Sequence, residues 1–373
     1  MALKFNILFI LSCLIHPTVC AQTLIKVLIE EISTEGEGSW ELESKHGLKS
    51  ELFESTNKKP ASKIKIFIRN GQIYYNGKQI KHPKVLIKPI NGPIAVNSNF
   101  YDGDFIIYKT ANRILLINRV ELESYISSVL KTESWPGWPK EVNKVFAVAS
   151  RSYVLAQVLT ARKTKSPYHI RNTNHHQTYS GIHDQADIKE AVLETKGMIL
   201  TYNGEPILAM FDCCCGGVVP ANMDGIDFVS HPYLARTERC LHCQPFKIYS
   251  WQASYTDQDF KKILQTVIPH VHSIRKVSIK TDKAGTVKNL LVHSGRNIHT
   301  VNARTIYSLF KEIKSFCYSI NQKSNTVHVN GTGFGHHLGL CQWGARKMVE
   351  KGHNYREILH FYYPKTKFTK FKG

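Results

Sequence analysis

Acidic residues are scarce in this sequence of 373 residues. It contains 29 Asp and Glu against 49 Lys and Arg, so its formal net charge at pH 7 is +20. A surface with so little negative charge repels basic partners and attracts polyanions. The composition therefore predicts a polyanionic partner. Which kind of polyanion it is depends on the compartment in which the protein works.

Long apolar runs are also rare. Beyond the first 21 residues, no stretch approaches the roughly 20 apolar residues that a membrane-spanning helix needs. The beginning of the chain, with Lys4 and an apolar run at residues 5–15, is typical of a secretory signal peptide. We expect cleavage after Ala21. Lipid attachment at Cys20 is the second alternative, because Thr18 and Val19 poorly match the usual residues before a lipidated cysteine.

The signal peptide predicts an exported, soluble protein that is periplasmic or associated with the cell wall. Membrane contact is expected only at the N-terminus, if Cys20 is lipidated. Export argues against nucleic acid as the polyanion, so cell-wall polymers and anionic membrane surfaces remain. Residues 365–372 alternate cations with aromatics and fit contact with either surface, and they fit a solvated tail equally well.

The sequence lacks internal repeats, a regular alternation of strands and helices, and an HExxH pair. The last absence disfavours a zinc hydrolase, and the mixed pattern of strands and helices predicts an α+β fold. We expect a β-rich N-terminal lobe at residues 22–93 and a main domain at 94–368. A smaller α+β insertion is expected at about 250–325, and a basic tail at 369–373.

A helix followed by a proline-rich junction is the most informative segment. Apolar residues recur every three or four positions over residues 122–130, which predicts a helix with Glu121, Glu123 and Lys131 on its solvent face. The following segment, SWPGWP at residues 134–139, cannot continue a helix because of its prolines. Glu133 therefore falls at the end of the helix.

The position of Glu133 favours a protonated carboxyl group. The negative end of the helix dipole and water exclusion by Trp135 and Trp138 are both expected to raise its pKa. Such a group suits general acid catalysis near neutral pH. The alternative is an exposed loop glutamate beside two core tryptophans.

Several motifs resemble one family. Residues 120–130 (VELESYISSVL), Glu133, the Trp138-Pro139 pair and residues 147–153 (AVASRSY) are similar to the signature of the stage II sporulation protein D and LytB (amidase enhancer) family. Residues 331–345 (GTGFGHHLGLCQWGA) resemble its GFGHGVGMSQWGA block, with His337 in place of a glycine and Leu340-Cys341 in place of Met-Ser. The resemblance spans residues 94–368 and includes shorter motifs at 177–181, 215–217, 232–234, 294–296 and 355–364.

This resemblance implies lytic transglycosylation of peptidoglycan glycan strands, with Glu133 as the general acid and base. One carboxyl group is sufficient, because the C6 hydroxyl of the muramyl residue attacks its own C1 and forms a 1,6-anhydro product. No cofactor is expected for this reaction, and a cell-wall amidase is an expected partner. The alternative function is that of a non-catalytic cell-wall binder that enhances an N-acetylmuramoyl-L-alanine amidase.

The family motifs and the residue types predict a sugar-binding groove around Glu133. Arginine offers a fork of donors to an acetamido or acidic group, aromatic faces stack on pyranose rings, and amides bond to hydroxyls. For each residue, a structural role in the core or at a rim is the alternative, and for the arginine a structural salt bridge. The candidates are Arg151, Tyr153, Gln177, Tyr179, His336 and Gln342.

The cysteines allow two interpretations. Cys240 and Cys243 have the spacing of a zinc site, and Cys215 with His175, or His176 in its place, would complete four ligands. Disulfides are the alternative in an exported protein. Seven cysteines follow Ala21, an odd number, so disulfides alone would leave one unpaired. Either arrangement would be structural.

Overall fold

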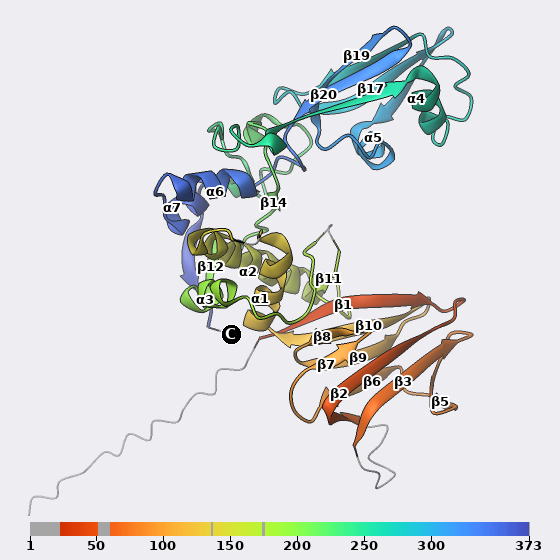
Figure 1. The fold of residues 1–373 in the computed structure, drawn as a ribbon, viewed down its shortest axis with the longest axis vertical. Coiled ribbons are helices and arrows are strands. Elements are labelled where there is room, and N and C mark those ends of the chain that lie inside the picture. Colours follow the sequence, from red (N-terminus) through yellow and green to blue (C-terminus); the bar gives the residue numbers. More distant parts are fainter. Residues whose placement is uncertain (1–22, 51–59, 136, 174–175, 373) are drawn as a thin grey trace, which may run out of the picture.

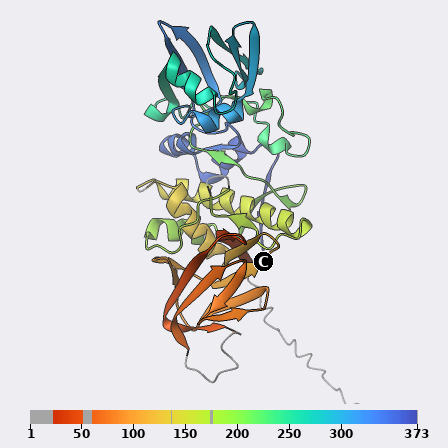
Figure 2. The same ribbon diagram turned by 90° about the vertical axis from the view of Figure 1, so that its right-hand side faces the viewer.

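The computed structural model describes residues 23–50, 60–135, 137–173 and 176–372. The expected signal peptide, with Cys20 and Ala21, lies outside the described residues, as does His175. The elements form three successive layers along the long axis of the molecule: a β-rich lobe, a helical layer and a smaller α+β lobe (Figures 1 and 2). The expected α+β fold is confirmed.

The N-terminal lobe is one large sheet. Its main path runs in the order β11-β1-β10-β9-β6-β2-β3-β4-β5, and β7 joins it through β2 while pairing with β8. The turns after β3 and β4 place Asn70 and Asn76 at positive φ, as the Asn-Gly hairpin pattern predicts. The strands are β1 (Leu24–Ser33), β2 (Gly38–Ser50), β3 (Ala61–Arg69), β4 (Gln72–Tyr75), β5 (Lys78–Ile80), β6 (Lys84–Pro89), β7 (Ile94–Val96), β8 (Asn99–Tyr101), β9 (Asp104–Lys109), β10 (Arg113–Glu121) and β11 (Ile170–Arg171).

This sheet continues past the expected boundary at residue 93. Strand β10 pairs with β1 along its whole length, and β9 pairs with both β10 and β6. The run of buried apolar residues in β10 therefore belongs to the N-terminal core, and the sheet ends only at Glu121, where the first helix begins. The helix that carries Glu133 is thus joined to the sheet without an intervening loop.

The helical layer is built around a long central helix, α2 (Lys140–Lys163), most of which is buried. Around it lie α1 (Leu122–Glu133), α3 (Ala186–Glu194), α6 (Gln342–Glu350) and α7 (Tyr355–Tyr362). The hydrophobic core of this layer is continuous with that of the sheet. Within the described part of the chain, no helix is both long and apolar enough to cross a membrane.

The basic C-terminal segment is only partly a tail. Strand β22 (Lys367–Lys370) pairs with β12 (Met198–Tyr202), which continues through the Asn203-Gly204 turn into β13 (Glu205–Pro206). The expected tail boundary at 369 is therefore wrong by about two residues, because Thr369 and Lys370 satisfy backbone hydrogen bonds in this sheet. A separate short strand, β14 (Phe211–Asp212), pairs with β21 (Leu340–Cys341).

The α+β lobe has a hydrophobic core of its own. It contains two three-stranded sheets, β15-β20-β19 and β16-β17-β18. The chain enters at Ser250 and leaves at Thr332, and these residues are partners in adjacent strands. The elements are β15 (Ser250–Thr256), α4 (Asp257–Leu264), β16 (Lys276–Thr281), β17 (Val287–Ser294), β18 (Asn297–Asn302), α5 (Ala303–Leu309), β19 (Cys317–Lys323) and β20 (Thr326–Thr332).

Candidate active site

Glu133 is the last residue of α1, as the apolar pattern and the following prolines predict. The Ser134 backbone N–H closes the helix on the Leu130 carbonyl oxygen. The Ser134 hydroxyl donates to the Asn143 side chain over 2.6 Å, and both residues are buried. This hydrogen bond fixes the junction to α2, so the position of Glu133 is set by two packed helices.

Glu133 lines a pocket of about 480 Å³. Tyr153 of α2, the backbone segment 209–213 and residues 334–336 of the glycine-rich block form its walls. Tyr307 and Phe316 of the α+β lobe also line it, and their rings stack with centroids 5.0 Å apart. The pocket thus lies between the helical layer and the α+β lobe, and aromatic, polar and backbone groups all reach it.

Burial raises the pKa of the Glu133 carboxyl group, and hydrogen bonds from Thr178 and Gln342 partly oppose this shift. The Thr178 N–H donates to Oε1 over 3.3 Å, and the Gln342 side chain lies 3.4 Å from the Glu133 carbonyl oxygen. Desolvation is the larger effect. The carboxyl group therefore stays protonated at a higher pH than an exposed glutamate.

The two tryptophans do not line this pocket. Trp135 is 52% exposed, and Trp138 stacks on Phe146. Both rings contact Trp343 of α6, and neither is among the residues that line the pocket. The raised pKa has the predicted direction, and the other residues that line the pocket come mostly from segments distant from Glu133 in the sequence.

Three of the predicted groove residues do line the pocket: Tyr153, His336 and Gln342. Burial lowers the pKa of His336 to about 4, so this imidazole is neutral at physiological pH. Tyr153 is nearly buried and its ring meets that of His176 edge to face. These side chains offer hydrogen-bonding groups and an aromatic edge beside Glu133, and their contact with a substrate stays a prediction.

Arg151, Gln177 and Tyr179 are buried and do not line the pocket. Arg151 forms a bidentate ion pair with Glu123 at 2.7 and 3.1 Å, which is the structural alternative to substrate binding. The side chain of Gln177 accepts a hydrogen bond from the Tyr125 hydroxyl, and the ring of Tyr179 stacks on that of Tyr125. These three residues hold the helical layer together, contrary to the predicted role in sugar binding.

A second carboxyl group, that of Asp212, lines the pocket and was not predicted from the sequence. Its Oδ2 accepts a hydrogen bond from the His337 N–H over 2.6 Å, and burial raises its pKa well above the usual range. Gly335 passes so close that a Cβ there would lie 2.5 Å from the Asp212 Cβ. Asp212 is the last residue of the two-residue strand β14, and Tyr307 and Phe316 belong to the α+β lobe. No local sequence motif marked these three residues.

His337 stands where the family pattern has a glycine, and its φ of 67° lies in the left-handed region. The imidazole is buried, accepts a hydrogen bond from the Phe316 N–H and pairs through Nδ1 with the Cys215 carbonyl oxygen. The histidine therefore compensates its backbone strain with two hydrogen bonds. Its side chain joins the glycine-rich block to the α+β lobe.

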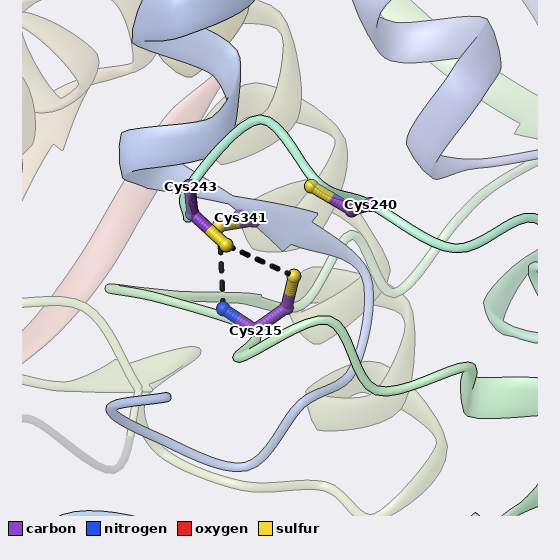
Figure 3. A group of neighbouring side chains, drawn as sticks. All are labelled: Cys215, Cys240, Cys243 and Cys341. Carbon is purple, nitrogen blue, oxygen red and sulfur yellow. Dashed lines mark hydrogen bonds between the residues drawn. The ribbon is translucent and has the colours of Figure 1, made fainter. Parts of the chain in front are cut away.

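Four cysteine side chains come together behind the pocket. Cys215, Cys240, Cys243 and Cys341 are buried, and their sulfur atoms lie within 4.8 Å of one another (Figure 3). The first three were predicted to lie together with a histidine. In the structure the fourth member of the group is Cys341, whereas His175 lies outside the described residues and His176 lines the Glu133 pocket. We call these four residues the cysteine cluster.

The raised pKa of Glu133 makes a prediction about stability. Between the ordinary glutamate pKa of 4.5 and the raised pKa, the folded protein keeps this proton and the unfolded chain has released it. The contribution of Glu133 to stability therefore falls as pH rises through this range. Glu133→Gln removes this cost. The variant should melt at a higher temperature than wild type at about pH 8 and lose this advantage near pH 4. Thermal melts of both proteins over this range test it, and equal curves would contradict the shift.

Comparisons with known proteins agree with the motifs. The model of the stage II sporulation protein family matches residues 110–202, which include Glu133 and Arg151. An uncharacterized protein of Brachyspira hyodysenteriae is 29% identical over 270 residues, covering 72% of each chain. Stage II sporulation protein D of Bacillus subtilis is 24% identical over 277 residues, which cover 70% of this chain and 78% of that protein.

A further relative differs in length. The amidase enhancer of Bacillus subtilis is 25% identical over 294 residues, covering 66% of this chain and 40% of its own length. The family model covers the helices that carry Glu133 and its neighbours, and the relatives extend the similarity over most of the chain. Residues 110–202 thus match the stage II sporulation protein family, and most of the chain is similar to stage II sporulation protein D and the amidase enhancer.

Proposed function

We propose that this protein cleaves the glycan strands of peptidoglycan by lytic transglycosylation. The observation that carries the proposal is Glu133, a carboxyl group with a raised pKa, held at a rigid helix end on the wall of a pocket lined by aromatic and polar groups. A protonated acid in such a place fits the first step of glycosidic cleavage. Similarity to this family supports the choice of substrate class.

In the proposed reaction, Glu133 first donates its proton to the glycosidic oxygen of the leaving sugar. The bond from C1 of the muramyl residue to that oxygen breaks, and the C6 hydroxyl oxygen of the same residue bonds to C1. The ionised Glu133 then takes the proton of that hydroxyl. No water is consumed, the products are a 1,6-anhydro-muramyl end and a free hydroxyl on the other sugar, and Glu133 is protonated again.

The neighbouring side chains suit this scheme. His336 is neutral, so it adds no charge that would stabilise ionised Glu133 before the reaction. The stacked rings of Tyr307 and Phe316 supply apolar faces for pyranose rings on the lobe side of the pocket. Tyr153 and Gln342 complete the set that we propose to bind the glycan. No cofactor takes part in these steps.

The expected place of action is outside the cytoplasm, in the periplasm or at the cell wall. The basic composition, with a net charge of +20, favours binding to anionic wall polymers over neutral glycans. Peptidoglycan strands are the proposed substrate, and a cell-wall amidase is the proposed protein partner, as the name of one relative suggests.

The direct test is mass spectrometry of the fragments that the purified protein releases from intact walls and from glycan freed of its stem peptides. Lytic transglycosylation predicts anhydro-muramyl ends, whereas hydrolysis gives reducing ends that carry one more water molecule. Anhydro ends from either substrate support the proposal, and the preferred substrate shows whether stem peptides must first be removed. Reducing ends alone would contradict it.

A second candidate function is stimulation of an amidase without glycan cleavage, and the amidase enhancer relative favours it. The same purified protein would then bind cell walls, release no glycan fragments and accelerate an added N-acetylmuramoyl-L-alanine amidase. Glu133→Gln would leave this stimulation unchanged, because no proton transfer is involved.

Replacing Asp212 distinguishes a transglycosylase that uses only Glu133 from a hydrolase that uses two carboxyl groups. Its raised pKa and its hydrogen bond from the His337 N–H indicate a protonated structural group, and asparagine offers an acceptor of the same shape. Asp212→Asn should therefore keep activity within about tenfold of wild type, short of the loss expected for a general acid. A loss as large as that of Glu133→Gln, measured as released muropeptides, would favour a hydrolase with two carboxyl groups.

A further inference from the structure

We propose that Cys215, Cys240, Cys243 and Cys341 bind one zinc ion as a tetrathiolate site that holds the back of the Glu133 pocket. The inference concerns the stability of the fold and does not depend on the proposed reaction. Binding releases the four thiol protons to solvent and forms four Zn–S bonds, with no redox step. A site with four protein ligands has no open position, so its role is structural.

The distances fit zinc. Four sulfur atoms at about 2.3 Å from a common tetrahedral centre lie about 3.8 Å from one another. The Sγ atoms of Cys215 and Cys243 are 3.7 Å apart, and those of all four cysteines fall within 4.8 Å (Figure 3). The two-residue gap between Cys240 and Cys243 lets one short loop present two ligands from the same side. The cluster needs little rearrangement to hold the ion.

Neighbouring groups donate hydrogen bonds to the sulfur atoms, as in established thiolate sites. The backbone N–H groups of Cys215 and Gly344 each donate to the Cys341 Sγ over 3.3 Å. Cys341 is the N-cap of α6, where the positive end of the helix favours a thiolate. The Tyr362 hydroxyl lies 3.2 Å from the Cys240 Sγ, and the buried guanidinium of Arg236 stands 5.7 Å from the centre of the Tyr362 ring. These groups partly neutralise the negative charge of the site.

Disulfides explain this arrangement less well. A disulfide joins only two sulfur atoms, at about 2.05 Å. It does not explain why two further cysteine sulfur atoms lie beside the first two. Here one cluster collects four thiols from three separate segments of the chain. The family pattern has serine at the position of Cys341, so the fourth ligand is a feature of this chain.

Two of the four proposed ligands, Cys215 and Cys341, lie next to segments that line the Glu133 pocket. Cys341 immediately precedes Gln342, which bonds to the Glu133 backbone, and Cys215 follows Asp212 and Cys213 on the opposite wall. Strands β14, which ends at Asp212, and β21, which ends at Cys341, pair over two positions, and backbone hydrogen bonds between Cys214 and Phe334 and from Trp343 to Cys213 extend this contact. A zinc ion would add metal–sulfur bonds to the backbone hydrogen bonds that join the two walls.

The test begins with the full-length wild-type protein, purified without added metal. Elemental analysis should find about one zinc per chain. Replacement with Co²⁺ should give the charge-transfer and visible bands of a tetrahedral thiolate site, and removal of zinc by a chelator should lower the melting temperature. Absence of zinc would overturn the proposal. Mass spectrometry of the non-reduced protein would then show whether the cluster holds two disulfides or four free thiols, and either result contradicts a zinc site.

Cys341→Ser is the matching variant, since serine keeps an N-cap acceptor for the Gly344 N–H and removes one ligand. It should lose most of its zinc and show a weakened or altered Co²⁺ spectrum. Cys317→Ser is the control, because Cys317 lies outside the cluster, and it should keep about one zinc per chain. If Cys341→Ser fails to fold, the Co²⁺ spectrum of the wild type decides the ligand set, and a spectrum without thiolate bands overturns it.

Discussion

Glu133→Gln should abolish the release of anhydro-muropeptides while leaving the fold intact. Glutamine keeps the size of the side chain and the acceptor for the Thr178 N–H, but it has no proton of suitable acidity to give to the leaving oxygen. Loss of general acid and base assistance is expected to lower the rate by about 100- to 10,000-fold. The measurement is the initial rate of anhydro-muropeptide release from purified glycan, followed by mass spectrometry.

Binding provides the control for this prediction. Because Glu133 is half-buried and glutamine keeps the size of its side chain, the replacement should change affinity for cell-wall material much less than it changes turnover. Cosedimentation of both proteins with purified walls measures this affinity. A variant that binds as wild type does and still releases anhydro ends at the wild-type rate would remove Glu133 from the mechanism.

Glu123→Ala is expected to have the largest effect on stability. Its carboxylate accepts hydrogen bonds from Nε and Nη2 of Arg151 and from the Gly197 N–H, the last over 3.0 Å. The side chain of Arg151 has no exposed surface, so removing its partner leaves a buried charge that is uncompensated. The cost of such a change is about 3 kcal/mol or more in the free energy of unfolding. Thermal and urea denaturation of the purified variant measure it.

A surface pair serves as the comparison. Glu194 binds Lys140 and Lys144, but its side chain is 42% exposed, so solvent screens these contacts. Glu194→Gln should therefore leave the melting temperature nearly unchanged. If Glu123→Ala and Glu194→Gln have equal effects, burial of Arg151 does not make its ion pair more important than a surface one.

Local pattern was sufficient for much of the fold. The apolar spacing and the prolines after Ser134 gave α1 its end at Glu133, and the Asn-Gly pairs gave the hairpin turns of the N-terminal sheet. Both signals depend on neighbours in the sequence. The end of the N-terminal sheet and the start of the C-terminal tail were misplaced because pairing between strands that are far apart in the sequence decides them.

In the candidate site, too, features that depend on neighbouring residues were predicted and features that depend on distant segments were not. Glu133 was found from its own segment, but Glu123, expected on the solvent face of α1, meets Arg151 of α2, so a pattern on one helix could not reveal its role. Asp212, Tyr307 and Phe316 reach the pocket from segments whose sequences carry no motif. Cys341 was visible as a departure from the family pattern, but only the fold brings it to the other three cysteines.

The chain passes into the α+β lobe and out of it at two adjacent positions, Ser250 and Thr332. A unit attached in this way can change in size, or be exchanged during evolution, while the helical layer keeps its connections. Because Tyr307 and Phe316 belong to that unit, such an exchange would alter one side of the pocket and leave Glu133 in place. Under the proposed function, substrate preference and bond cleavage can therefore evolve separately in this architecture.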